Sequence, residues 1–118
     1  WIQRVANLHG KTTGDVNYLF CDDAKILEIN QHYLQHDYYT DIITFDYSSG
    51  RIISGDIYIS VDTVETNALQ YNCELKNELY RVIIHGILHL CGFDDTTPEL
   101  KQQMTELENA ALQLLQTP

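Results

Sequence analysis

His85 and His89 are spaced so that both can bind one metal ion from the same side of a helix. Residues four apart lie on one face of an α-helix, and imidazole nitrogens are common metal ligands. Gly92 follows at a position suited to end that helix, because glycine readily adopts positive φ. Asp95 comes three residues later. The spacing H-x-x-x-H-x-x-G-x-x-D therefore predicts a metal site with His85, His89 and Asp95 as its ligands.

The third ligand has a competitor in sequence, because Asp94 is adjacent to Asp95. Either carboxylate can instead cap the next helix or be solvated. The two histidines have a simpler interpretation as well, as buried residues that bond to backbone or carboxylate partners. The glycine and the carboxylate that follow His89 favour the metal site over that interpretation.

Two imidazoles and one carboxylate leave a position open, which is typical of a catalytic zinc site. Zinc lowers the pKa of a bound water and acts as a Lewis acid on carbonyl or phosphoryl oxygens. Because one predicted ligand is a carboxylate, manganese and nickel also suit this ligand set. Gly86 stands where metalloproteases with a similar elongated motif have a glutamate base. The pattern thus predicts hydrolysis, without a substrate or an identifiable general base.

The histidines lie in a segment, residues 76–91, that is apolar nearly all round in its C-terminal two-thirds. Such a helix is typically central and buried, so we expect the metal site at its C-terminal end. Thr97 and Pro98 form a strong helix start. An apolar stripe then runs to the C-terminus at helical spacing: Leu100, Met104, Leu107, Ala111, Leu114 and Leu115.

The N-terminal two-thirds alternates helical and strand patterns. Residues 2–8 resemble a helix, and a strand follows from Asp15, with Val16, Tyr18 and Phe20 on its buried face. Asp22 or Asp23 caps a helix that ends near Leu34. Its expected inward residues are Ile26, Ile29, Asn30 and Tyr33.

Residues 42–47 and 51–60 are expected to form a hairpin around the turn at 48–50, with Gly55 and Asp56 interrupting the return strand. Ser60 or Asp62 then caps a helix. Its expected inward residues are Val61, Val64, Ala68 and Tyr71. We predict one α/β domain of the α+β type over residues 1–118, with several helices packed on a small mixed or mostly antiparallel sheet of three or more strands. The chain opens on Trp1, so we allow for a native segment, including a strand, before it.

Charge and composition restrict the function. The formal net charge is −10 with only seven Lys and Arg residues, which disfavours nonspecific nucleic-acid binding and any DNA partner. No apolar run is long enough to span a membrane, and no signal segment is visible. Three cysteines without a CxxC pair indicate reduced thiols. We therefore expect a soluble cytoplasmic protein.

Three blocks of the chain resemble the YbeY family of bacterial endoribonucleases, which act in maturation of ribosomal RNA. The family signature H-G-x-L-H-L-x-G-[FY]-D-H is matched from His85 to Asp94, and two upstream blocks are matched by residues 30–45 and 55–59. The resemblance implies a single-strand-directed, metal-dependent endoribonuclease with one bound zinc ion, acting in the cytoplasm. It implies ribosomal RNA, ribosomal particles, or a ribosomal or assembly protein as partners.

The chain departs from the family at three positions. The last histidine of the signature is Asp95, the family arginine is Leu34, and the family lysine is His36. The loss of two basic residues weakens the direct case for RNA cleavage. A hydrolase of peptides or small esters therefore stays open, as does a non-catalytic ribosome-assembly module with a structural metal.

The remaining candidate residues concern the substrate and the support of the metal ligands. For substrate binding the candidates are His36, Thr40, Thr44 and Arg81, although an exposed loop histidine, β-propensity at Thr44 and pairing of Arg81 with an acid explain them equally simply. Asp56 is a candidate to orient a metal-bound histidine, with a strand-end hydrogen bond as its alternative role.

Overall fold

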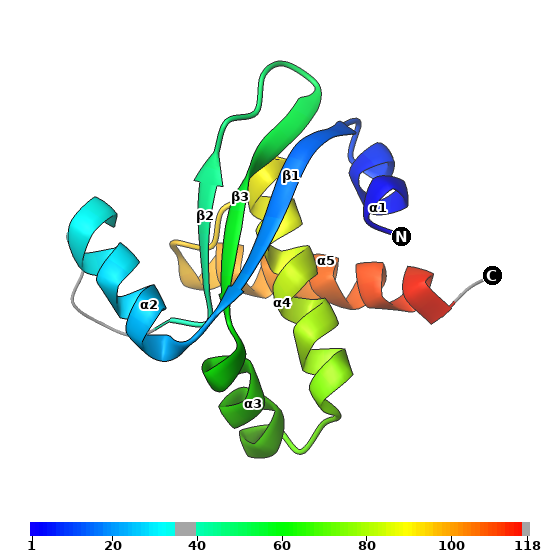
Figure 1. Ribbon diagram of the computed structural model, residues 1–118. Coiled ribbons are helices and arrows are strands. Elements are labelled where there is room, and N and C mark those ends of the chain that lie inside the picture. The colour runs from blue at the N-terminus through cyan, green and yellow to red at the C-terminus, as the bar shows by residue number, and fades with distance from the viewer. Residues whose placement is uncertain (35–39, 117–118) are drawn as a thin grey trace.

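The computed structural model describes residues 1–34 and 40–116, and these form an α+β fold as the sequence predicted. The elements in chain order are α1 (Ile2–Leu8), β1 (Thr12–Cys21), α2 (Asp23–Ile29), the π-helical turn η1 (Asn30–Leu34), β2 (Ile42–Asp46), β3 (Ile52–Ser60), α3 (Val61–Gln70), α4 (Leu75–Leu90) and α5 (Pro98–Gln116). Figure 1 shows α4 crossing behind the sheet, and α5 crossing behind α4.

The sheet is mixed, with strand order β1-β3-β2. β2 and β3 form the predicted antiparallel hairpin, whereas β1 pairs in parallel with β3. The expected interruption at Gly55 and Asp56 is wrong, since β3 runs through both residues. Gly55 is nevertheless a point of close backbone approach, because a Cβ there would collide with the carbonyl oxygen of Phe45.

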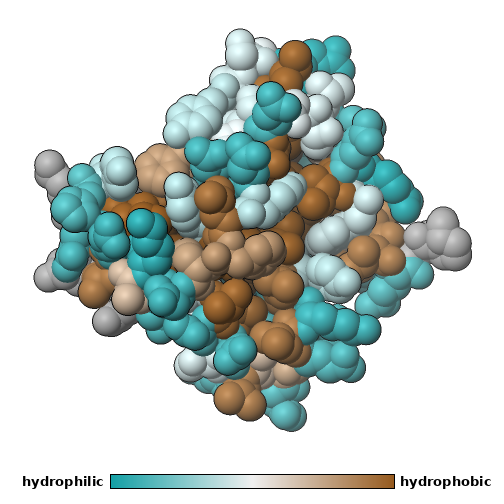
Figure 2. All heavy atoms as spheres, in the orientation of Figure 1, coloured by the Kyte–Doolittle hydropathy of each residue, from teal (hydrophilic) through white to brown (hydrophobic). Residues whose placement is uncertain are grey.

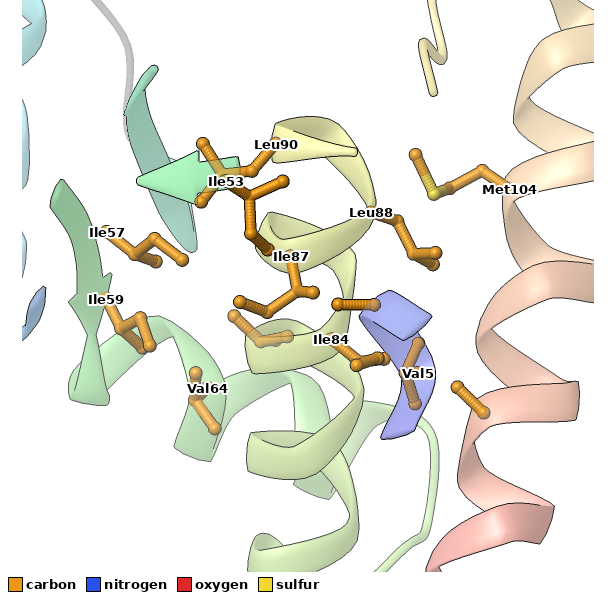
Figure 3. Close-up of a cluster of buried hydrophobic side chains, with 13 residues drawn as sticks. Val5, Ile53, Ile57, Ile59, Val64, Ile84, Ile87, Leu88, Leu90 and Met104 are labelled. Carbon is orange, nitrogen blue, oxygen red and sulfur yellow. The ribbon is translucent and has the colours of Figure 1, made fainter. Parts of the chain in front are cut away.

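The main core lies between β3 and α4. Every second residue of β3 is buried toward the helix, as the period of two of a strand requires. Figure 3 shows the isoleucines of β3 directed at the apolar face of α4, with side chains of α1, α3 and α5 completing the cluster. The labelled members of this cluster are Val5, Ile53, Ile57, Ile59, Val64, Ile84, Ile87, Leu88, Leu90 and Met104. α4 is therefore the central buried helix that its composition predicted.

The turn between α4 and α5 follows the predicted chemistry. Gly92 has φ of +103°, and its N–H donates to the carbonyl oxygen of His89, while the N–H of Phe93 donates to that of Leu88. The hydroxyl of Thr97 accepts a hydrogen bond of 3.1 Å from the N–H of Leu100 and so caps α5. The chain between these two helix ends brings the carboxylate of Asp95 back toward α4.

Four residues expected to face inward are substantially exposed instead: Phe20 (54%), Tyr33 (72%), Val61 (38%) and Tyr71 (64%). Tyr33 lies in the π-helical turn η1, where the residue period departs from that of the preceding α-helix. Val61 and Tyr71 lie at the two ends of α3, beyond the packed part of its face. Phe20 is near the end of β1 and is not among the residues packed on the main core.

Apolar side chains also reach the surface. Figure 2 shows them along the middle of one face of the molecule, with hydrophilic side chains around them. All three cysteines are free, as their number and spacing predicted. Within residues 1–34 and 40–116, no helix combines the length and the apolar character that crossing a membrane requires.

Candidate metal centre

His85 and His89 lie one turn apart on α4 and open into a polar pocket of about 650 Å³. The pocket lies between α4, the start of β2 and α5. Asp95, from the turn before α5, completes the rim beside the two histidines. About a quarter of each histidine side chain is exposed (22% and 24%), so the imidazoles are held by packing and still reach the pocket.

Three ligand atoms converge at the rim of this pocket. The Nε2 atoms of His85 and His89 are 3.0 Å apart, and Oδ2 of Asp95 lies 3.3 Å from the first and 3.5 Å from the second. With metal–ligand bonds of about 2.0–2.1 Å, ligand atoms of a tetrahedral ion lie roughly 3.3–3.4 Å apart. The three residues would therefore fit a divalent metal of zinc-like size, and all three line the same polar pocket.

Asp94 has a different role from Asp95. Its Oδ1 accepts a hydrogen bond of 2.8 Å from the N–H of Asp95, and its Oδ2 lies 3.2 Å from the hydroxyl of Thr96. Both oxygens of Asp94 thus hold the turn, whereas a carboxylate oxygen of Asp95 is directed at the histidines. The geometry favours Asp95 as the third ligand.

Glu108 of α5 is the closest acidic neighbour of His85. Its Oε2 lies 2.5 Å from Nδ1 of His85, and its Oε1 accepts a hydrogen bond of 3.0 Å from Nη1 of Arg81. Burial by itself lowers the pKa of the His85 imidazole, but the carboxylates of Glu108, Asp95 and Asp41 outweigh burial, so the pKa is raised. A carboxylate therefore lies beside each ring nitrogen of His85, Glu108 at Nδ1 and Asp95 at Nε2.

The structure brings three of the four predicted substrate residues to the pocket. Thr40, Thr44 and Arg81 line it, and Thr40 Oγ1 also lies 3.4 Å from the carbonyl oxygen of Ile42. The sequence left two roles open for Arg81, lining the pocket and pairing with an acid, and Arg81 has both. His36 lies outside the described residues.

Asp56 is not brought to the metal centre, which corrects its expected role in orienting a histidine. It accepts a hydrogen bond of 3.0 Å from Asn17 of β1 and lines a separate groove with Tyr58 and Phe45. The reason is the period of a strand: Gly55 and Ile57 face α4, so Asp56 between them points to the opposite face of the sheet.

Sequence reasoning missed four charged residues that line the pocket: Asp41, Glu78, Lys101 and Glu108. Burial is the main cause that raises the pKa of the Asp41 and Glu78 carboxyls. Glu108 carried a visible signal, because it interrupts the apolar stripe of α5 one turn after Met104 and is itself buried. The others lie at surface-like positions in the sequence and carried no comparable signal.

The fold and this centre together define a small α+β protein in which two histidines and one carboxylate, a group that could hold a metal ion, open to a polar pocket. The family model described as Endoribonuclease YbeY matches residues 1–116. The chain therefore belongs to the YbeY family of endoribonucleases, as its motifs indicated.

Several relatives are highly similar. The chain is 59% identical over 115 residues to Endoribonuclease YbeY of Parabacteroides distasonis, covering 98% of this chain and 81% of that protein. It is 58% identical over 112 residues to Endoribonuclease YbeY of Bacteroides thetaiotaomicron, covering 95% and 82%. The fold is similar to the solution structure of TM1509 from Thermotoga maritima, with a TM-score of 0.59 and 29% identity over 91% of this chain and 73% of that one.

Proposed function

We propose that this protein is a zinc-dependent endoribonuclease that cuts single-stranded RNA during maturation of ribosomal RNA in the cytoplasm. The observation that carries the proposal is the convergence of His85 Nε2, His89 Nε2 and Asp95 Oδ2 within 3.5 Å of one another at an open polar pocket. The relatives in Parabacteroides distasonis and Bacteroides thetaiotaomicron are named Endoribonuclease YbeY, which supports the reaction class.

Zinc is the metal we propose, because two imidazoles and one carboxylate at tetrahedral spacing suit it well. When bound, zinc supplies a Lewis acid and a water of lowered pKa. The chain supplies the rest: His85, His89 and Asp95 hold the ion at the pocket rim, and Thr40 and Thr44 line the same pocket. The Thr44 hydroxyl is the suitable donor to a phosphate oxygen there, whereas the Thr40 hydroxyl donates to the carbonyl oxygen of Ile42.

Two cations line the pocket in the described part of the chain, Arg81 and Lys101. Both Nη atoms of Arg81 donate to α5, to Glu108 and to Asn109 at 2.7 Å. Lys101 is exposed on the first turns of α5 and lines the pocket beside Asp95. We propose Lys101 as the main contact to the RNA phosphate, in place of the family basic residues that are Leu34 and His36 here.

The net charge of −10 opposes binding to a polyanion. A partner that presents the RNA resolves this conflict, and we propose a ribosomal particle, or a ribosomal or assembly protein, in that role. Local attraction at Lys101 then has to position one phosphate and does not have to hold a whole strand.

Neither alternative function has a comparable observation in its favour. A peptidase of the elongated zinc motif needs a glutamate at position 86, where Gly86 is buried and a Cβ would lie 2.8 Å from Ile42 Cδ1. A purely structural metal is normally closed by four protein ligands, whereas these three residues adjoin a pocket of about 650 Å³.

The test is a substrate panel with defined metal content. We expect purified protein loaded with about one zinc per chain to cut single-stranded ribosomal RNA sequences, to spare duplex RNA, DNA and peptides, and to lose activity to a chelator until zinc is restored. Parallel reloading with manganese or nickel checks the choice of metal. Intact RNA in the presence of fully metallated protein would overturn the proposal.

A further inference from the structure

Glu108 is a buried carboxylate in the middle of an apolar stripe. It lies on α5 one turn after Met104 and is only 7% exposed. A buried carboxylate is costly unless its oxygens are bonded. Met104 and Ala111 on the same face are apolar and also buried, so an apolar residue would suit position 108 for packing alone. The contacts of Glu108 must therefore supply the compensation.

Both oxygens of Glu108 are bonded to residues one turn apart on α4. Oε1 accepts from Nη1 of Arg81 at 3.0 Å, and Oε2 lies 2.5 Å from Nδ1 of His85. Arg81 is itself fixed, because its Nη2 donates to Oδ1 of Asn109 at 2.7 Å. The carboxylate is thus oriented by Arg81 so that one oxygen is presented to the ring of His85.

This contact decides which nitrogen of His85 carries the proton. A carboxylate oxygen only accepts, so Nδ1 must donate to it. The lone pair of a neutral imidazole then lies on Nε2, and that is the atom 3.3 Å from Asp95 and 3.0 Å from His89 Nε2. Metal-binding histidines commonly donate their other ring N–H to a carboxylate in this way, and loss of such a partner typically lowers metal affinity about 10–100-fold.

We propose that Glu108, oriented by Arg81, is a positioning residue that fixes the tautomer and ring orientation of His85 for metal binding. The proposal rests on the metal centre of the proposed function. It also gives Arg81 a role within the protein, since its Nη1 and Nη2 atoms donate to Glu108 and Asn109 of α5. The C-terminal helix is then part of the metal centre although it supplies no ligand.

The variant Glu108→Gln tests this role at nearly constant side-chain volume. Glutamine has a single carbonyl oxygen, and the Arg81 guanidinium competes for it, which turns the amide NH₂ toward Nδ1 of His85. The amide N–H then donates to Nδ1, which can accept only without its own proton. The variant therefore favours the tautomer of His85 that is protonated on Nε2, the atom needed for the metal. We expect zinc affinity, measured by competition with a chromophoric chelator, to fall about 10–100-fold.

The matched control is Glu106→Gln, because Glu106 is exposed on the same helix. It should leave zinc affinity within about twofold of the wild type. If Glu108→Gln lowers the melting temperature of the metal-free protein but binds zinc as tightly as the wild type, Glu108 only joins α4 to α5 and the proposal is wrong.

A measurement on the wild type keeps the test decisive even if the variant does not fold. In the zinc-loaded protein, ¹H–¹⁵N correlation of the imidazoles should show His85 protonated at Nδ1 and bound through Nε2. Coordination through Nδ1 would overturn the positioning role. If the wild type takes up no zinc at all, it is instead the proposed function that fails, so the two failures are distinct.

Discussion

Gly86 lies so close to Ile42 that a Cβ on the glycine would be 2.8 Å from Ile42 Cδ1. The added Cβ would also lie 3.2 Å from Cδ1 of Ile57. The absence of a side chain at Gly86, which lies between the two histidines in sequence, lets α4 approach the hairpin closely. His85, His89 and Thr44 of the hairpin then line one pocket. The missing side chain at position 86 is therefore a condition for the geometry of the metal centre.

Gly86→Ala should destabilise the protein by about 1–3 kcal/mol, the usual cost of overpacking a core. Helix propensity alone predicts the opposite sign, a gain of about 1 kcal/mol for alanine over glycine inside a helix. The free energy of unfolding from urea denaturation separates these effects. An alanine variant more stable than the wild type would show that α4 does not pack as tightly on the hairpin as described.

Asp95→Ala should weaken zinc binding by at least about 10–100-fold. That loss is typical when only a residue that hydrogen-bonds to a metal ligand is removed, and here a ligand itself is lost. Asp94→Ala is the matched control, because its oxygens bond to Asp95 N–H and Thr96 and not to the histidines. We expect it to bind zinc within a few-fold of the wild type. Competition titration of both variants checks this, and the reverse order of affinities would assign the ligand to Asp94.

Lys101→Met should weaken binding of single-stranded RNA to the metal-free protein, where cleavage does not interfere. Loss of one phosphate contact lowers the salt slope of the binding constant by about 0.7. Lys76→Met serves as the control, because Lys76 lies in a separate groove with Tyr80 and Leu112. Equal losses of affinity in the two variants would mean that RNA responds to overall charge and not to the pocket.

Glu78→Gln should change how stability depends on pH. Burial, and then the charge of Asp41, raise the pKa of Glu78 above its ordinary value of 4.5. A carboxyl whose pKa is raised by folding contributes stability below its unfolded pKa and loses it as pH rises through the folded pKa. The metal-free variant should therefore gain melting temperature relative to the wild type as pH rises from about 4 to 7.5. A difference that is constant across this range would contradict the role of ionisation at Glu78.

Much of the candidate metal centre could be predicted from local spacing. His85 and His89 share a helix, and Gly92 and Asp95 follow within one turn and a short loop, so neighbouring positions determine their relative geometry. The hairpin and the Thr97 cap were predictable for the same reason. These features depend on contacts between residues near one another in the sequence.

The supporting residues depend on tertiary packing, and for that reason sequence reasoning missed them. Glu108 meets His85 across 23 positions, and only the crossing of α4 and α5 brings them together. Asp56 shows the converse error: a motif residue near the site in the family pattern points to the other face of the sheet, because one step along a strand reverses the side chain. The π-helical turn at Tyr33 likewise could not be read from an apolar period of 3.6.

His89→Ala tests the central claim most directly, with zinc content and cleavage of single-stranded ribosomal RNA measured on the same preparations. His89 donates a ligand atom 3.0 Å from that of His85 and 3.5 Å from that of Asp95. The wild type should contain about one zinc per chain and cut the RNA, and the folded variant should do neither. Zinc-free variant protein that still cuts RNA at the wild-type rate would contradict a metal-dependent nuclease at this centre.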